Sequence, residues 1–240
     1  MLCIPALCVL ADPISDLDDA AARAQYAFYT ADSRTLEDVL GLIERLQVPP
    51  ALTVMKEYYG AFGNWKLAQL YTEAAAGKPA TRASLEKAAQ DCQRHAKAAL
   101  QLDPRFGEAS AIDAICSAFV PGLTQTSCAR SKSLRMAQEI EPTNPRIKLI
   151  EVMCFEKDEV ASAAYAEKLR ATANAFETAP PSRPGKPDWG QAEALLLLGQ
   201  NYLQRGDLVA ARDAIEHALV IAPDYRRAQE LLETAATRPR

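Results

Sequence analysis

A helix–turn–helix pattern near the C-terminal end constrains the fold of this chain more than any other feature. In residues 191–204 the large and small apolar residues recur at helical spacing, and a Gly206-Asp207 turn follows. A second run with the same period continues to Pro223. The residues that carry the pattern are Leu195, Leu198, Gly199, Tyr202, Ala211, Ile215 and Ala218. Two short helices of this kind bury their apolar faces only by packing on each other and on further helices.

The same punctuation occurs at three places along the sequence. The segments 97–109, 136–149 and 217–229 each show the end of an Ala-rich helix, then a proline, then the start of a new helix. Proline cannot continue a helix, and it disfavours helical backbone at the residue before it. The chain has only 10 glycines in 240 residues and few runs with strand period. These observations predict an all-α fold assembled from repeated helical hairpins.

This order of small, large and punctuating residues resembles the tetratricopeptide repeat (TPR), a unit of about 34 residues that stacks on its neighbours. The resemblance implies a right-handed superhelical solenoid of about five helix-turn-helix hairpins plus a closing C-terminal helix. We expect TPR-like repeats over 61–236, with the best repeat at 192–225 and the closing helix at 225–236. Residues 12–60 are predicted to form an N-terminal helical region that is TPR-like only in its periodicity.

In TPR proteins the first helix of each hairpin lines the concave face, where peptides or partner helices bind. Alignment with the family pattern places the following residues on that face: Phe62, Trp65, Gln69, Glu73, Glu108, Ala111, Ile115, Phe119, Arg146, Leu149, Met153, Glu156, Glu193, Leu196, Gln200 and Leu203. The set is fairly apolar and lacks the Lys/Asn/Arg clamp of chaperone-binding members, which disfavours a co-chaperone role. The alternative is that neighbouring repeats or the N-terminal helices cover several of these residues.

The composition argues against several other functions. A net charge of −4 and an isoelectric point near 5.4 disfavour a nucleic-acid partner, because phosphate binding needs a basic face. No phosphate-binding glycine loop, zinc-protease motif or serine-hydrolase motif is present. We therefore expect no catalysis, cofactor or metal. The alternative from another class is a helical enzyme with a site at Cys92 and His95, which share one face of a predicted helix.

The N-terminus and the cysteines bear on the compartment. Residues 1–11 are apolar and uncharged, and they resemble the end of a signal peptide although no basic segment precedes them. Cys116 ends one predicted helix and Cys128 begins the next, so a Cys116–Cys128 disulfide is one candidate pairing, and free buried thiols or another pairing are the others. We expect a periplasmic or secreted bacterial protein; the alternative is a cytoplasmic adaptor with reduced thiols.

The sequence therefore predicts a non-catalytic protein-interaction scaffold that binds a peptide or helix in its concave groove.

A proline-rich segment at 178–190 interrupts the repeats. It is interpreted either as a stiff linker or as a docking arm that Trp189 anchors on a neighbour or a partner. Most of the aromatic residues in the first third of the chain are expected in the core. Self-association through the exposed end of the stack is a further alternative.

Overall fold

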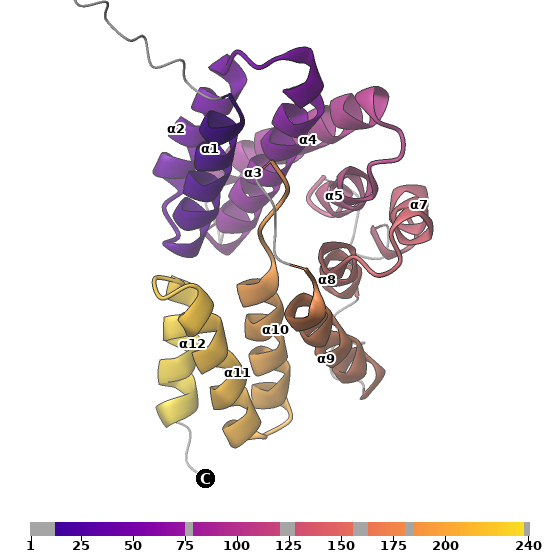
Figure 1. Cartoon of the computed structure of the whole chain (residues 1–240). Helices are drawn as coiled ribbons and strands as arrows, with labels where there is room; N and C mark the ends of the chain where they lie inside the picture. Colours follow the sequence, from indigo (N-terminus) through magenta and orange to yellow (C-terminus); the bar gives the residue numbers. More distant parts are fainter. Residues whose placement is uncertain (1–12, 75–78, 121–127, 156–162, 181–184, 238–240) are drawn as a thin grey trace, which may run out of the picture.

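The computed structural model describes residues 13–74, 79–120, 128–155, 163–180 and 185–237, and within them every regular element is helical (Figure 1). The predicted all-α fold is confirmed. The helices are α1 (Pro13–Tyr29), α2 (Ser33–Arg45), the 3-10 helix η1 (Pro50–Leu52), α3 (Thr53–Ala74), α4 (Pro79–Leu102), α5 (Gly107–Ser117), α7 (Lys132–Ile140), α8 (Pro145–Met153), α9 (Ala163–Thr178), α10 (Gln191–Gln204), α11 (Leu208–Ile221) and α12 (Arg226–Thr237). Consecutive helices pack as hairpins that stack along a curved solenoid, with α12 last.

Local residue chemistry explains where these helices begin. Asp32 caps α2 by accepting a hydrogen bond from the backbone N–H of Thr35, at 3.0 Å. Asp207 caps α11 in the same way. Gly206 ahead of it has a φ of +80°, a conformation that favours glycine. Pro145 lies in the first turn of α8. A backbone N–H at this position would have no acceptor within the helix, so proline costs no hydrogen bond there.

Helix α3 is the centre of the N-terminal half. It packs against α1, α2, α4 and α5, so residues on nearly all of its faces are buried. Gly60 and Gly63 allow the close approach of neighbouring side chains, because a Cβ at either position would lie 2.8 Å from His95 or Leu40. Helix α3 therefore forms the centre of the core in this half of the molecule.

The two ends of the described solenoid also touch each other. The ring of Tyr29 at the end of α1 lies 4.5 Å, centroid to centroid, from that of Tyr225, just before α12. At the periphery, Arg227 of α12 forms an ion pair of 2.9 Å with Glu73 of α3. These contacts link helices more than 150 residues apart, so the superhelix closes on itself.

Two disulfides staple successive hairpins together. Cys92 of α4 is bonded to Cys116 of α5, and Cys128 is bonded to Cys154 at the end of α8. The candidate Cys116–Cys128 pairing is therefore wrong, and the alternative of another pairing describes the structure. Each cysteine bonds across the interface to an adjacent hairpin, over 24 and 26 residues, instead of across its own short connection. In the chain-entropy model, closing loops of that size stabilises the fold by about 3 kcal/mol each.

Candidate functional site at the closed concave face

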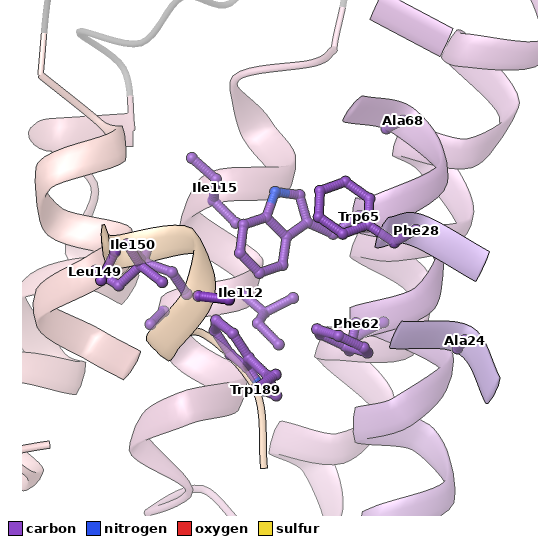
Figure 2. Close-up of a cluster of buried hydrophobic side chains, with 14 of the residues drawn as sticks. Ala24, Phe28, Phe62, Trp65, Ala68, Ile112, Ile115, Leu149, Ile150 and Trp189 are labelled. Atoms are coloured by element: carbon purple, nitrogen blue, oxygen red, sulfur yellow. The ribbon is translucent and has the colours of Figure 1, made fainter. Parts of the chain in front are cut away.

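Most of the residues predicted on the concave face lie in the core of the protein. Phe62, Trp65, Ile115, Leu149 and Leu196 are 0–3% exposed. Figure 2 shows several of them meeting in a single cluster together with Ala24 and Phe28 of α1. The alternative raised from the sequence, in which neighbouring repeats or the N-terminal helices cover several of these residues, describes the structure. These side chains are not open to a partner in this conformation.

The other predicted residues are divided between the core and the surface. Glu108, Ala111, Glu193 and Leu203 are also buried. Half-buried side chains are those of Gln69, Phe119, Arg146, Met153 and Gln200, and Glu73 is exposed. Glu156 lies outside the described residues. Binding of a partner by this set therefore stays a prediction, and Arg146 is the member that borders a surface groove described below.

Trp189 fills the middle of the concave face. It is 5% exposed, and its ring lies 5.3 Å from the rings of both Phe62 and Trp65 (Figure 2). Its indole Nε1 donates a hydrogen bond of 2.7 Å to the hydroxyl of Tyr58. Of the two interpretations of the proline-rich segment, the docking arm fits better. Trp189 anchors the chain to its own concave face.

A buried ion pair lies beside this cluster. The Nζ of Lys66 is 3.1 Å from Oε1 of Glu193, and the two side chains are 0% and 5% exposed. Lys66 also lies over the ring of Trp65, 3.9 Å from its centroid. Glu193 accepts hydrogen bonds from Gln25 (3.0 Å), from Tyr29 (2.8 Å) and from the backbone N–H of Gly190 (3.1 Å). One carboxylate thus ties together α1, α3 and the start of α10.

Burial and this pairing act in opposite directions on the two charges. Burial lowers the pKa of the Lys66 ammonium, and the nearby Glu193 carboxylate opposes that change. Burial alone would raise the pKa of Glu193, but Lys66 and the hydrogen-bond donors hold it below its usual value. The carboxylate therefore stays ionised. The pair connects α3 of the N-terminal half to α10 of the C-terminal half.

A network of hydrogen bonds connects Trp189 to α5 and to the start of α8. Tyr58, which accepts from Trp189, donates a hydrogen bond of 2.6 Å to Glu108, and Asn144 donates another of 2.8 Å to the same carboxylate. Arg146 lies 3.7 Å from Glu108. Burial raises the pKa of Glu108, although Arg146 and the donors oppose the change. Both oxygens of the Glu108 carboxylate thus have a partner, as a buried polar group requires.

The surface of the protein has a hollow where α1 meets the turn between α11 and α12. This hollow, the rim groove, consists of two adjoining cavities of about 370 and 270 Å³ that share Gln25, Tyr29, Asp188 and Ile221. Tyr26 and Ile221, which line the smaller cavity, are 56% and 44% exposed. Exposed large apolar side chains at the edge of a cavity are a feature of binding surfaces.

The structure does not support a thiol site at Cys92 and His95. Cys92 is bonded to Cys116 and has no thiol. His95 is 3% exposed, and its Nδ1 and Nε2 lie 2.7 Å from Glu57 and 3.0 Å from Glu44. A cleft of about 400 Å³ between α2, α3 and α4 adjoins it, but its charged side chains pair with one another, as in Lys87–Asp91 and Arg94–Glu44. A site that uses a free thiol at Cys92 is therefore contradicted by this disulfide.

Neither a metal site nor a membrane span is found in the part of the chain that the structure describes. It holds no group of three or more His, Cys, Asp or Glu side chains placed to bind a metal ion. Over the same residues, no helix combines the length and the apolar character needed to span a membrane.

Comparison with known proteins identifies the fold. The structure is similar to the crystal structure of a thermophilic TPR protein from Thermus thermophilus, with a TM-score of 0.51 and 13% sequence identity, over 95% of this chain and 100% of that one. No protein-family model and no curated protein matches the sequence. The chain therefore has a TPR-like helical solenoid fold, as its repeats predict.

The buried ion pair between Lys66 and Glu193 was not predicted from the sequence. Lys66 is the one charged residue in the stretch Phe62–Leu70 of α3, between Trp65 and Leu67, and that position is the signal that could have identified it. A lysine at the centre of an apolar helix requires an acidic partner. Glu193 was assigned to the concave face, but nothing in the sequence alone linked it to a residue so far away in the chain.

Proposed function

We propose that this protein is a non-catalytic protein-interaction scaffold whose partner binds at the rim groove, with the concave interior serving as its core. The observation that supports the proposal most strongly is the occupation of the concave face by α1 and Trp189. Repeat solenoids present extended binding surfaces, and the TPR-like neighbour is consistent with such a role. With the interior filled, the exposed apolar residues Tyr26 and Ile221 offer the accessible contact area.

Site-specific photo-crosslinking in the cells that produce the protein tests this proposal. A benzophenone amino acid in place of Tyr26 is expected to form a covalent adduct with a partner, because that side chain projects beside the groove. The matched control is the same amino acid in place of Val209, which is 83% exposed on α11 and does not line the groove. Adducts at position 209 and none at position 26 would contradict a rim interface, and no specific adduct at either would contradict a scaffold.

We also propose that the protein works in an oxidising compartment, the periplasm or outside the cell. Two disulfides within a fold of this size support the proposal, because cytosolic reductants keep most thiols reduced. The apolar residues 1–11 fit export but lie outside the described residues.

Cysteine alkylation of protein taken directly from those cells tests the compartment. In denaturant but without reduction, Cys92, Cys116, Cys128 and Cys154 should remain unmodified, and peptide mapping should recover the 92–116 and 128–154 pairs. Reduction before alkylation serves as the control and should modify all four. Alkylation of these cysteines in unreduced protein would favour the cytoplasmic alternative.

A further inference from the structure

The geometry points to the chemistry of the partner segment. We infer that the rim groove binds an extended peptide segment in which an aliphatic or aromatic side chain is flanked by lysine or arginine. This inference rests on the proposed scaffold function and gives it a ligand class. It follows from two properties of the same groove, an apolar floor and a negatively charged border.

The floor of the smaller cavity is apolar and large enough for one bulky side chain. It is lined by Ala22, Tyr26, Tyr29, Ile221, Ala222 and Pro223. Its volume is about 270 Å³, whereas an apolar cavity of about 150 Å³ accommodates a benzene ring. A leucine, phenylalanine or tryptophan side chain therefore fits with room for part of its neighbour. Burial of that side chain would cover Tyr26 and Ile221, which are both largely exposed.

The border of the groove carries negative charge on two sides. Asp188, whose side chain is 86% exposed, lines both cavities, and Asp224 lines the smaller one. Asp224 is held in place by a hydrogen bond of 3.3 Å from the hydroxyl of Tyr26. These carboxylates favour a cationic side chain next to the apolar anchor and disfavour an acidic one.

Two helix ends strengthen the same preference. Helix α1 ends at Tyr29 and α11 ends at Ile221, and both residues line the groove. The aligned peptide dipoles give the C-terminal end of a helix a partial negative charge. Of the described residues that line the two cavities, Arg146 is the one cation; its side chain is 14% exposed and lies 3.7 Å from Glu108 and 3.9 Å from Asp188, so it offers little positive charge to a ligand. The groove therefore selects a basic apolar segment.

Retention of peptide pools on the immobilised full-length protein tests this inference. Three pools of acetylated, amidated hexapeptides share the same randomised central apolar residues and differ only in their flanking residues, which are lysine, glutamine or glutamate. We expect the lysine pool to be retained at least about fivefold more than the glutamine pool, with the glutamate pool lowest. A substitution that removes apolar contact and adds positive charge, Ile221→Lys, should reduce retention of the lysine pool at least about tenfold.

Matched variants separate the two properties of the groove. Val220→Lys changes the neighbouring residue, which is 78% exposed and outside the groove, and should alter retention less than about twofold. The Asp188→Asn/Asp224→Asn double variant should abolish the preference for lysine over glutamine. Asp213→Asn, at a side chain 72% exposed on α11, should leave it unchanged.

Several results would overturn the inference: retention of none of the pools, equal retention of all three, a preference for glutamate, or no effect of Ile221→Lys. Burial of the groove between two copies of this chain, seen as a dimer that Ile221→Lys dissociates, would also overturn it. If crosslinking at position 26 captures a partner while the lysine pool is not retained, the scaffold proposal stands and the ligand class is wrong. If both fail, the rim groove is not a binding site.

Discussion

Replacing Trp189 with alanine should lower the free energy of unfolding by about 3–5 kcal/mol, the range for truncation of large buried aromatic side chains. Trp189 is 5% exposed, contacts the rings of Phe62 and Trp65, and donates a hydrogen bond to Tyr58. Alanine would leave a cavity at the point where the concave face is filled. Urea unfolding followed by far-UV circular dichroism measures the effect without relying on tryptophan emission.

The control for this experiment is an apolar truncation on the surface. Val209 is 83% exposed, and Val209→Ala should change the stability by no more than about 0.5 kcal/mol. If Trp189→Ala were as mild as Val209→Ala, Trp189 would not be a core residue. The segment that precedes α10 would then be a linker and not an anchored arm.

Breaking the buried ion pair should have an effect of similar size. Glu193→Gln preserves the shape of the side chain, but it replaces one accepting oxygen by an NH2 donor and leaves the buried Lys66 ammonium without its counter-ion. Loss of one partner from a buried pair typically destabilises a protein by about 3–5 kcal/mol. The double variant Lys66→Met/Glu193→Gln removes the isolated charge, so it should be more stable than Glu193→Gln alone.

The pH dependence of these variants provides a second test of the pair. Burial lowers the pKa of Lys66, so the folded state gives up its proton more readily than the unfolded state does. In Glu193→Gln no carboxylate opposes this effect. Stability of that variant should therefore rise with pH below the ordinary lysine pKa of about 10.4. The double variant lacks the ammonium and should show a flatter profile. Equal slopes for the two variants would contradict burial of a charged Lys66.

The repeat architecture could be predicted because it depends on local chemistry. Three prolines lie in turns between successive helices, because proline cannot continue a helix: Pro104, Pro142 and Pro223. The Gly206-Asp207 turn and the Asp32 cap could also be recognised in the sequence, since each acts on residues within a few positions. Hairpins and their order follow from such short-range rules.

The closure could not be predicted because it depends on contacts between distant residues. Alignment with the repeat pattern places Phe62, Trp65 and Leu196 on the inward side of the solenoid. Periodicity does not tell whether another segment of the chain covers that side. Trp189 and α1 cover it here. The disulfide partners could not be predicted for a related reason, since Cys116 and Cys128 are close in sequence while their partners lie in adjacent hairpins.

Tryptophan fluorescence of the native protein can show whether the chain closes its own concave face. The chain has two tryptophans, Trp65 and Trp189, and both lie in the concave cluster with exposures of 0% and 5%. Water around an indole ring shifts its emission to longer wavelength, and acrylamide quenches only rings that it can reach. We predict blue-shifted emission that acrylamide quenches weakly, with both properties lost on unfolding. Red-shifted, readily quenched emission from the folded protein would show that the concave face is open to solvent and that the chain does not close it.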